Sequence, residues 1–411
     1  MKAEIVAIGT ELLLGQIANT NAQKISTSLA NIGVDVHFHT VVGDNPERMV
    51  ATLRTARDRS DAVIVTGGLG PTPDDITREA IAEVTGRALS RDPELEATIR
   101  AVFSKMSHPM PDDNLRQADL PEGAEVIAIE GTAPGFWVED DRGIIFALPG
   151  VPWEMAAMLE KSVIPKLKEL GGDNVLVSRE VIVLGLGESR THEKIADVVD
   201  RQTNPTIAYR AGGGLVRLRI SAKATSDAAA IALIDPVEEE IRSRLGINAV
   251  AGHHDSLAEA LGAMLREQEL TVAAAESLTG GTIGMELTRV GGSGDFFLGS
   301  LVCYATESKR DVAGVDPAIL EGPGAVSPEA AGALAEAAVD RFKADLGLGA
   351  TGVAGPSEQE GKPVGTIFVA ARFHGRTEVR SIRGYGDREN IRAIATNAAL
   401  DLGRRMVLGA I

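Results

Sequence analysis

The sequence predicts an α/β protein with two three-layer α/β domains joined by a small α+β module. Its 411 residues suit two or three domains. In the first and last parts of the chain, short apolar runs alternate with stretches of helical periodicity, the pattern of strands and helices in an α/β fold. The 45 glycines cluster at specific turns, and only 3% of the residues are aromatic, so the core must consist of Ala, Val, Ile and Leu.

The first domain is predicted to span residues 1–170 and to contain a parallel, doubly wound sheet. The run 62–65 is apolar throughout, as expected of a strand buried on both faces. Gly33 follows a helical pattern, where it would end the helix. The predicted strands are 5–8, 34–42, 62–65 and 144–148, and the predicted helices are 19–32, 46–60, 76–86 and 153–170.

Two further domains are predicted, a small α+β module at 171–252 and an α/β domain at 253–411, with boundaries at 171–173 and 252–255. In the small module the predicted strands are 175–184 and 216–224, and the predicted helices are 188–199 and 228–245. In the last domain the predicted strands are 271–275, 301–304, 346–350 and 367–371, and the predicted helices are 256–267, 282–290 and 387–406.

The charge balance and the cysteine count exclude several classes of protein. Lys and Arg number 41 and Asp and Glu number 58, so the formal charge is −17. This argues against a general nucleic-acid or anionic-membrane binder, since both need a positive face. The single cysteine excludes a disulfide framework within the chain and a Cys-rich zinc site. The sequence has neither a membrane-length apolar run nor a signal-peptide layout, so a cytoplasmic location is expected.

Glycine-rich turns follow two of the predicted strands and share the pattern Thr-Gly-x-x-Gly-Pro, at residues 66–71 and 351–356. Glycine lacks the Cβ that would keep a ligand away from backbone N–H groups. The carboxyl ends of parallel strands are where α/β proteins bind ligands. A tight turn without a ligand is the alternative for either one alone, but two occurrences in separate domains favour ligand sites.

The first of these turns continues into Asp74 and Asp75 and is expected to bind an anion together with a metal ion. Backbone N–H groups of a glycine-rich loop before a helix can hold phosphate oxygens. The aspartates would repel a phosphate unless a divalent cation such as Mg²⁺ bridged them to it. The alternative is that one aspartate caps the helix beginning near Ile76. The segments 9–11 and 149–154 also follow strands and should open on the same sheet edge.

The second candidate site centres on Ser277, which follows an apolar strand and precedes a helix. A serine hydroxyl needs a base to act as a nucleophile. Lys309, after the next strand, can serve as that base if burial or neighbouring cations lower its pKa. The alternatives are an N-cap role for Ser277 and a solvated surface position for Lys309.

The motifs of the first domain resemble those of the CinA family (competence/damage-inducible protein A). The family motif Gly-Gly-Leu-Gly-Pro-Thr-x-Asp-Asp-x-Thr is matched by residues 67–77, with further matches at 9–15, 131–136 and 148–155. The resemblance implies a molybdopterin-binding-like fold and hydrolysis of ADP-ribose with a divalent cation, Mg²⁺ or Co²⁺. The residues expected at the nucleotide and pyrophosphate are Gly9, Thr10, Glu11, Gly67, Gly68, Leu69, Gly70, Pro71, Thr72, Arg116, Pro134, Gly135, Pro149, Gly150 and Glu154, and those expected at the metal are Asp74, Asp75 and Glu11.

This domain departs from the family pattern at two positions. Arg116 stands where Lys is expected, and Ala128 stands where Asn is usual. Arginine keeps the positive charge of lysine but not its point-donor geometry.

The last domain resembles the nicotinamide-nucleotide amidase family. Its Ala-Glu-Ser-x-Thr-Gly-Gly signature is matched by residues 275–281, and its Tyr and Lys are matched by Tyr304 and Lys309. Further matches lie at 349–356, 362–366 and 386–392. The resemblance implies hydrolysis of the carboxamide of nicotinamide mononucleotide to nicotinic acid mononucleotide and ammonia, without a cofactor.

The resemblance also implies a role for each matched residue. Ser277 would attack the amide carbon, Lys309 would take its proton, and Tyr304 would orient the pair by a hydrogen bond. Backbone N–H groups near Ser277 or at 351–352 would hold the oxyanion. The other residues expected in catalysis or substrate binding are Thr351, Glu276, Thr279, Gly280, Gly281 and Gly352.

Two arginines of the predicted final helix are candidates for binding the nucleotide phosphate. A guanidinium fork suits phosphate oxygens, so Arg388 or Arg392 would take this role. The alternative is a surface ion pair with Asp387 or Glu389.

The middle module of the family is described as similar to KH domains. Residues 212–214 are three glycines rather than the Gly-x-x-Gly clamp that grips nucleic acid, so a spacer or dimer element is expected instead. The resemblance as a whole favours a homodimeric, bifunctional hydrolase of pyridine-nucleotide recycling that acts on small nucleotides. The alternatives are an amidase whose first domain binds a nucleotide or molybdopterin-like ligand without turnover, and a competence-related scaffold without enzyme activity.

Overall fold

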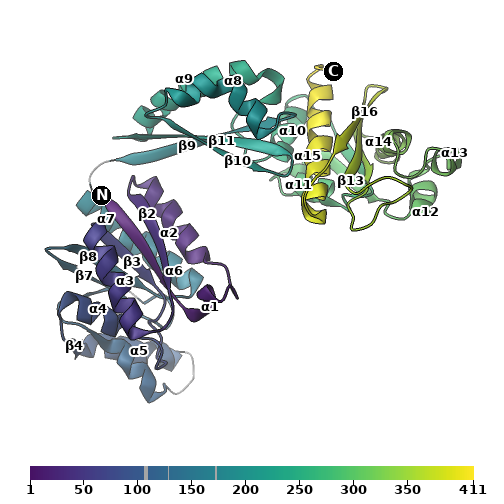
Figure 1. Cartoon of the computed structure of the whole chain (residues 1–411). Coiled ribbons are helices and arrows are strands. Elements are labelled where there is room, and N and C mark those ends of the chain that lie inside the picture. The colour runs from purple at the N-terminus through teal and green to yellow at the C-terminus, as the bar shows by residue number, and fades with distance from the viewer. Residues whose placement is uncertain (106–109, 128, 172–173) are drawn as a thin grey trace. The chain divides into compact units, whose positions relative to one another are not determined.

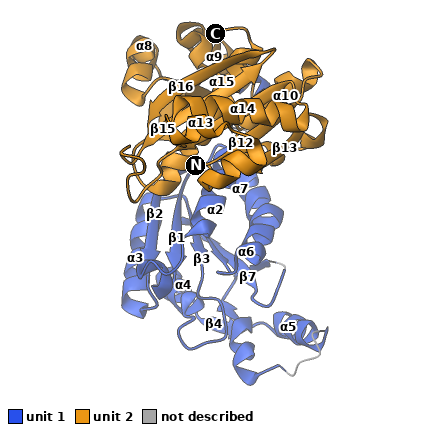
Figure 2. Cartoon of the chain, turned by 90° about the vertical axis from the view of Figure 1, so that its right-hand side faces the viewer, with its two compact units in different colours: residues 1–177, 223–230 blue, residues 178–222, 231–411 orange. Residues whose placement is uncertain are grey.

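The computed structural model describes residues 1–105, 110–127, 129–171 and 174–411. It forms two compact units, coloured separately in Figure 2: Met1–Val177 with Lys223–Ala230, and Ser178–Ala222 with Ile231–Ile411. Each unit contains an α/β domain, which confirms the predicted fold class. Ala128 and most of the boundary predicted at 171–173 lie outside the described residues. Every helix in the described part of the chain is too short or too polar to span a lipid bilayer.

The first unit is built on a six-stranded sheet in the order β2 (Asp35–Val42), β1 (Lys2–Ile8), β3 (Ala62–Thr66), β8 (Gly143–Leu148), β7 (Gly135–Asp140) and β6 (Glu125–Ile127). The first four strands run parallel, whereas β7 and β6 are antiparallel to their neighbours. The four predicted strands are therefore parallel, as predicted, and the two antiparallel strands at this edge were not predicted. Only two residues separate β7 from β8, and so short a turn can join only antiparallel strands.

Helices cover both faces of this sheet (Figure 1). Alternate residues of β3 face opposite layers, since Val63 and Val65 belong to one buried cluster and Ile64 to another. The first cluster includes α3 (Pro46–Arg59), α4 (Thr77–Thr85) and α5 (Pro93–Lys105), and the second includes α2 (Thr20–Asn31), α6 (Pro152–Met158), η2 (Leu159–Val163) and α7 (Ile164–Gly171). The elements that the sequence did not predict are α1 (Thr10–Leu13), β4 (Leu89–Arg91), α5, η1 (Asp112–Ala118), β5 (Asp119–Pro121), β6 and β7.

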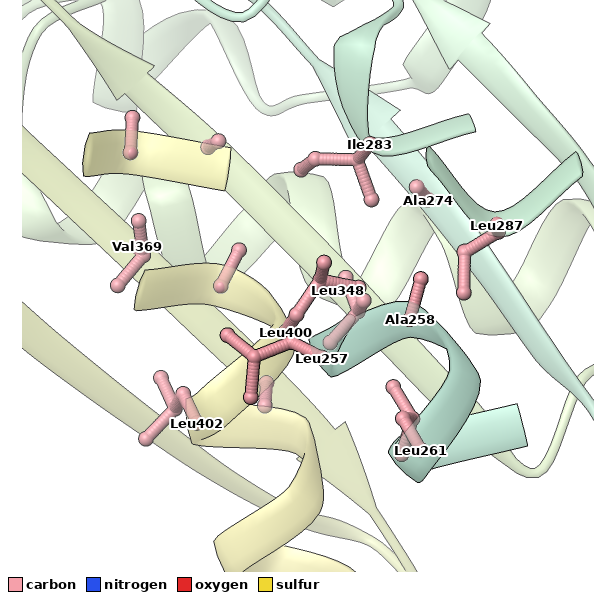
Figure 3. Close-up of a cluster of buried hydrophobic side chains, with 14 of the residues drawn as sticks. Leu257, Ala258, Leu261, Ala274, Ile283, Leu287, Leu348, Val369, Leu400 and Leu402 are labelled. Carbon is pink, nitrogen blue, oxygen red and sulfur yellow. The ribbon is translucent and has the colours of Figure 1, made fainter. Parts of the chain in front are cut away.

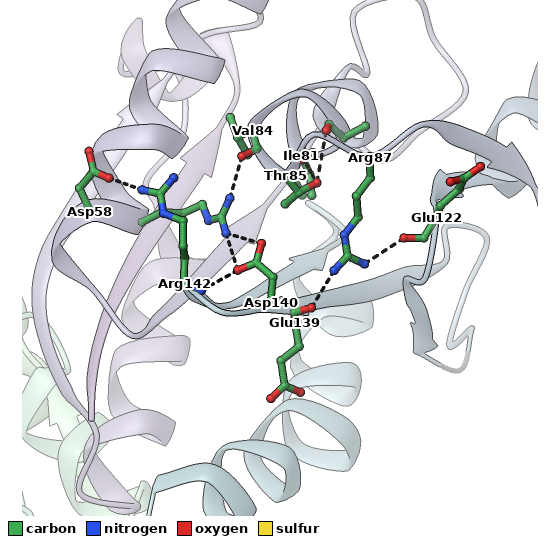
Figure 4. A network of polar contacts seen from close by, with 11 residues as sticks. Asp58, Ile81, Val84, Thr85, Arg87, Glu122, Glu139, Asp140 and Arg142 are labelled. Atoms are coloured by element: carbon green, nitrogen blue, oxygen red, sulfur yellow. Dashed lines mark hydrogen bonds and ion pairs between the residues drawn. The ribbon is translucent and has the colours of Figure 1, made fainter.

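An arginine network ties α3 and α4 to the β7–β8 hairpin (Figure 4). The buried Arg57 donates to both carboxylate oxygens of Asp140, at 2.6 and 2.5 Å, and to the carbonyl of Val84 at 2.7 Å. Arg87 donates to the carbonyl of Glu139 at 2.7 Å. A buried guanidinium is tolerated only when it is paired in this way, so the network fixes the hairpin on the helical layer.

The second unit combines the small module with the last domain. The small module has a sheet of β10 (Thr206–Gly212), β11 (Leu215–Ala224) and β9 (Val175–Leu184), with α8 (Glu188–Asp200), α9 (Asp227–Leu245) and η3 (Gly246–Asn248). The sheet of the last domain has the order β13 (Phe297–Val302), β12 (Val272–Glu276), β14 (Leu346–Gly352), β15 (Thr366–Phe373) and β16 (Arg376–Arg383). Its first three strands are parallel and its last two antiparallel.

Helices on one face of the last sheet form the core shown in Figure 3. Leu257 and Leu261 of α10 (Leu257–Glu267), Ile283 of α11 (Thr282–Thr288) and Leu400 of α15 (Arg388–Val407) pack with strand residues such as Leu348. On the other face lies α14 (Pro328–Phe342), which the sequence did not predict. Short connections complete the domain: η4 (Ser293–Asp295), α12 (Thr306–Ser308), η5 (Lys309–Ala313) and α13 (Pro317–Glu321).

Candidate functional sites

A cavity of about 160 Å³ lies at the carboxyl ends of β12 and β14 and collects the reactive groups predicted for the last domain. The predicted residues that line it are Ser277, Tyr304, Lys309, Thr351, Gly352 and Arg388. The predicted residues that do not line it are Glu276, Thr279, Gly280, Gly281 and Arg392. The sequence prediction did not include Ser357 and Gln359, two polar residues that also line this cavity.

Ser277 is fixed in the turn that leaves β12. Its backbone N–H donates to the carbonyl of Ala350 at 2.9 Å, and its own carbonyl accepts from the N–H of Gly280 at 3.0 Å. Helix α11 begins only at Thr282 and has Gly281 at its N-cap, so the alternative of an N-cap role for Ser277 is wrong. The side chain is therefore held at the cavity by backbone contacts rather than used to end a helix.

Glu276 supports this turn and does not reach the cavity, which corrects its predicted role in substrate binding. Its buried carboxylate accepts from the N–H groups of Gly281, Ile283 and Gly284 at 2.9, 3.0 and 2.9 Å. It also accepts from the hydroxyl of Ser300 on β13 at 2.7 Å. These donors include the first N–H groups of α11, where a carboxylate is favoured by the helix dipole.

Lys309 is the buried amine of the cavity, only 2% exposed, so the alternative of a solvated surface lysine is wrong. Its Nζ donates to the carbonyls of Cys303, Tyr304 and Ala305 at 3.0, 3.2 and 3.5 Å. Burial lowers the pKa of Lys309, and nearby anionic groups oppose this only in part. The carbonyls stabilise the ammonium form, whereas burial favours the neutral amine. Ser277 and Lys309 line the same cavity, and no hydrogen bond between described atoms joins them.

Tyr304 contacts Lys309 through its carbonyl, while its hydroxyl accepts a hydrogen bond from Arg388. No hydrogen bond between described atoms joins this hydroxyl to Ser277 or Lys309, so its orienting role stays a prediction. Arg388 also donates to the carbonyl of Gly355, and it lines the cavity. These contacts replace the surface ion pair considered as an alternative for Arg388.

Arg392 holds the serine turn from outside the cavity. Its Nε and Nη2 donate to the carbonyl of Thr279 at 3.2 and 2.7 Å. Gly280 and Gly281 have φ values of 60° and 98°, which side chains rarely adopt, so their part is to shape the same turn. The structure thus separates the two candidate arginines, with Arg388 at the cavity and Arg392 behind the turn.

The loop opposite Ser277 is fixed by Thr351 and by Glu360, a residue that the sequence prediction did not include. The Thr351 hydroxyl donates to the carbonyl of Ala325 at 2.7 Å. The Glu360 carboxylate accepts from the N–H groups of Ala325 and Val326 at 3.1 and 3.0 Å. Thr351 therefore builds the cavity wall with its side chain.

A second cavity, of about 350 Å³, lies at the carboxyl ends of β1, β3 and β8 in the first unit. The predicted residues that line it are Gly9, Glu11, Gly67, Gly68, Leu69, Gly70, Pro71, Asp74, Asp75, Pro149, Gly150 and Glu154. The predicted residues that do not line it are Thr10, Thr72, Arg116, Pro134 and Gly135. The three strand ends thus meet at one cavity, as their position in a parallel sheet suggests.

The glycine-rich loop of this cavity is held from behind by Arg78, a residue that the sequence prediction did not include. The buried guanidinium donates to the carbonyls of Leu69 and Gly70 at 2.8 and 3.1 Å. Gln117 adds a bond to the Leu69 carbonyl at 3.1 Å, and the Thr77 hydroxyl donates to the carbonyl of Gly67 at 2.8 Å. No periodicity or motif signals such a role, because the acceptors are backbone atoms of a loop.

Arg116 is directed to the outer side of the same loop. It donates to the carbonyl of Thr72 at 2.6 Å and forms an ion pair with Glu79 at 2.9 Å. The structure therefore gives Arg116 a loop-holding contact and no place in the cavity lining. Its place at the nucleotide stays a prediction.

The acidic residues of this cavity differ in their surroundings. Asp75 accepts from the N–H and the hydroxyl of Thr72, while helix α4 begins at Thr77 without a side-chain cap, so the alternative of a helix-capping aspartate is wrong. Asp74 has an exposed side chain. Glu154 is 5% exposed, burial raises its pKa, and none of the described residues forms a hydrogen bond with its Oε2.

The carboxylates of this cavity can hold a divalent cation only together with oxygen atoms from another source. No three acidic, imidazole or thiol side chains in the described part of the chain gather closely enough to form a metal site by themselves. Mg²⁺ is nevertheless often held by one or two carboxylates together with substrate phosphates. Asp74 and Asp75 beside the glycine-rich loop suit that arrangement, in which the cation is completed by the substrate.

Comparison with known proteins relates the whole chain to one group of proteins. Residues 4–169 match the family described as "Probable molybdopterin binding domain". Residues 178–251 match the family "Damage-inducible protein CinA KH domain", and residues 254–407 match the family "CinA C-terminal domain". A CinA-like protein from Frankia casuarinae is 45% identical over 100% of this chain and 97% of its own length. A CinA-like protein from Synechocystis is 44% identical over 98% of this chain and 99% of its own length. A solved CinA structure from Thermoplasma acidophilum is 34% identical, covers 40% of this chain and 96% of its own, and has a TM-score of 0.37.

Proposed function

The chain belongs to the CinA family, and we propose that its last domain hydrolyses the carboxamide of nicotinamide mononucleotide to nicotinic acid mononucleotide and ammonia. The observation that carries the proposal is that Ser277 and Lys309 are both buried and line one cavity. A buried lysine with a lowered pKa is the kind of base that a serine nucleophile requires.

The proposed reaction uses Ser277 as nucleophile and Lys309 as proton carrier. The Ser277 Oγ bonds to the amide carbon while the neutral Lys309 Nζ takes the hydroxyl proton. Backbone N–H groups near Ser277 or at the end of β14 stabilise the negative oxygen of the tetrahedral intermediate. Lys309 then gives its proton to the amide nitrogen, and the carbon–nitrogen bond breaks to release ammonia. Water then attacks the acyl carbon while Lys309 takes one of its protons. Lys309 returns this proton to Ser277 Oγ as the ester bond breaks, which releases the carboxylic acid and restores both residues.

Arg388 is the proposed phosphate-binding residue. It lines the cavity, and its guanidinium donates to the uncharged oxygens of Gly355 and Tyr304 rather than to a carboxylate. Its positive charge therefore remains unneutralised by these contacts. A guanidinium in this state favours a phosphate at the cavity mouth.

The test is release of ammonia from nicotinamide mononucleotide by the full chain. Ser277→Ala should lower kcat by about 10³-fold or more, because the nucleophile is lost. Ser381→Ala is the matched control, since Ser381 is an exposed serine of β16 outside the cavity lining. Normal ammonia release by Ser277→Ala would refute the nucleophile assignment, and no release by the wild-type chain would favour the scaffold alternative.

For the first domain we propose hydrolysis of ADP-ribose to AMP and ribose 5-phosphate with Mg²⁺ or Co²⁺. Support comes from the single cavity shared by the glycine-rich loop and the carboxylates of Glu11, Asp74 and Asp75. The loop N–H groups would bind the pyrophosphate, and Asp74 and Asp75 would hold the cation, which neutralises charge on the phosphates when bound.

The assay for this domain is AMP release with and without added metal. Asp74→Asn should abolish metal-dependent AMP release, whereas amidase activity, in the other unit, should be retained. Metal-independent AMP release would contradict the proposed cation. No AMP release by wild type, with ammonia release intact, would leave the amidase as the only activity.

A further inference from the structure

A third cavity, of about 330 Å³, lies between the small module and the last domain, within the second unit. Its walls come from the end of β9 and the start of α8, from β10 and β11, and from β16 and α15. None of the residues that line it lines the amidase cavity. It is therefore a separate opening in the same unit.

The walls of this cavity are held together by contacts between the two modules. Asn390 accepts from the N–H of Gly213 at 3.3 Å, and Asn397 donates to the carbonyl of Gly213 at 2.8 Å. Arg404, buried in α15, donates to the carbonyl of Ile247 at 2.8 Å. Ile182 and Leu184 of β9 belong to the same buried cluster as the core of the last domain. The cavity is thus enclosed by elements of the small module and the last domain that pack against each other.

Most of the lining is apolar. Leu184, Leu215 and Val216 contribute from the small module, and Ile382 and Ile394 contribute from the last domain. An apolar surface in a pocket of this size binds the apolar body of a small ligand.

Two arginines of β16 give the cavity its charge. The guanidinium groups of Arg380 and Arg383 form no hydrogen bond or ion pair with any described residue, although most arginines of this acidic protein are paired. Burial lowers the pKa of Arg380, and the nearby carboxylates of Asp401 and Glu378 oppose this only in part, so its guanidinium is partly desolvated. An unpaired guanidinium beside apolar walls is costly, and an anion would offset that cost.

The acidic groups of the lining do not cancel this charge. Asp401 accepts from Arg404 at 2.7 and 3.0 Å and from Arg405 at 2.7 Å, so its charge is already neutralised by two arginines. Glu188, at the start of α8, is the other acidic residue of the lining. The two positive charges of Arg380 and Arg383 therefore outnumber the one carboxylate of the lining, Glu188, that is not paired with arginines.

We propose that this cavity binds a small anion with an apolar body, a carboxylate or phosphate ester whose acidic group pairs with Arg380. The apolar body lies against Ile382, Ile394 and Ala398, and the acidic group lies toward β16. The site is independent of the proposed amidase and pyrophosphatase reactions, because it uses neither cavity.

Binding of the fluorescent aromatic sulfonate anilinonaphthalenesulfonate to the full chain tests the proposal. Wild type should show one saturable site, and Arg380→Gln should raise its Kd by about 10-fold or more, as expected for loss of a charge-assisted hydrogen bond. Ala398→Phe, which fills the cavity with an apolar ring, should abolish the same binding. Arg376→Gln is the matched control, because Arg376 lies on the same strand, is exposed and pairs with Glu378 outside the cavity.

Competition with three aromatic compounds of similar size identifies the acidic group. Phenylacetate and phenyl phosphate should displace the probe, and the stronger competitor shows whether a carboxylate or a phosphate is preferred. The neutral phenylacetamide should not displace it. Equal displacement by phenylacetamide, or wild-type probe binding in both Arg380→Gln and Ala398→Phe, would overturn the proposal, as would the absence of saturable binding to wild type.

Discussion

The two Thr-Gly-x-x-Gly-Pro turns are built alike, although they belong to different domains. Thr66 and Thr351 are buried, and each donates its hydroxyl to the carbonyl of a neighbouring loop, at 3.1 and 2.7 Å. At the following residue, Gly67 or Gly352, a Cβ would lie 2.3 Å from a backbone carbonyl oxygen. The shared sequence therefore encodes close packing of strand ends, which creates the edge of a cavity but does not select its ligand.

The chemistry differs because other residues supply it. In the last domain the reactive groups Ser277 and Lys309 are buried and held by backbone contacts. In the first domain Glu11 and Asp74 are exposed to solvent. A desolvated amine needs no further group to become a base, whereas solvated carboxylates suit a site that is completed by a cation and its substrate. The contrast teaches that burial, more than the turn motif, determines the kind of chemistry.

The largest expected effect is a loss of amidase activity on substitution of Lys309, the buried amine that distinguishes the cavity of the last domain from that of the first. Lys309→Met should lower amidase kcat by about 10³-fold, in the range expected for loss of a general base. Lys309→Arg is the informative companion, because it keeps a positive charge and N–H donors for the carbonyls but cannot become neutral. Ammonia release and thermal stability of both variants give the measurement. Near-normal activity of Lys309→Arg would show that charge, and not proton transfer, is what the site needs.

The next effect concerns the loop of the first domain, which depends on Arg78. Arg78→Met should lower the free energy of unfolding of the first unit by about 3 kcal/mol, because buried carbonyls lose their donor. Both tryptophans of the chain, Trp137 and Trp153, lie in this unit, so urea unfolding followed by tryptophan fluorescence reports it selectively.

The matched control for Arg78 is Arg54→Met. Arg54 forms an exposed ion pair with Glu83 at 3.0 Å, and such pairs contribute less than about 1 kcal/mol. Amidase activity should survive in both variants, since we propose it for the other unit. Equal stability of the two variants would show that Arg78 is not needed to hold the glycine-rich loop.

A smaller effect separates the two arginines of α15. Arg388→Gln should raise KM for nicotinamide mononucleotide by about 10-fold with little change in kcat, as expected when a group binds substrate and transition state equally. Arg392→Gln should instead lower kcat and thermal stability, because Arg392 holds the Thr279 carbonyl of the serine turn. The same pattern in both variants would remove the distinction drawn from the structure.

Several features of fold and site were predictable because they depend on local sequence. The positions of β3, β12 and β14 follow from continuous apolar runs, and Ser277 and Lys309 could be placed because both follow strands on one sheet edge. The shared-cavity prediction for these two residues agrees with the structure, while their chemical roles remain proposals.

Other features were missed for identifiable physical reasons. Helix α14 is rich in alanine and buried over much of its surface, so it lacks a clear polar face. Strand β13 was predicted at 301–304 but lies at Phe297–Val302, because this edge strand is partly exposed and has no continuous apolar run. Glu276 and Tyr304 lie next to the site in sequence, but tertiary contacts turn the Glu276 carboxylate toward α11 and the Tyr304 hydroxyl toward Arg388.

The smallest expected effect is a dependence of stability on pH that only the buried amine should produce. Burial lowers the pKa of Lys309 in the folded chain, while in the unfolded chain it returns to about the ordinary value of 10.5. Between these two pKa values the unfolded state binds more protons than the folded state, so the free energy of unfolding rises with pH in that window. The contribution of one group is at most about 1.4 kcal/mol per pH unit.

Comparison of wild type with Lys309→Met isolates this contribution. Hydrogen exchange of the segment around η5 should show wild type gaining protection relative to Lys309→Met as the pH rises toward 10.5, after correction for the intrinsic exchange rate. The tryptophan signal of the first unit should show no such difference between the two proteins, because Lys309 belongs to the other unit. If the pH dependence of the η5 segment were the same in both proteins, Lys309 would titrate as an ordinary lysine. The contrast between a desolvated site and a solvated one would then lose its physical basis.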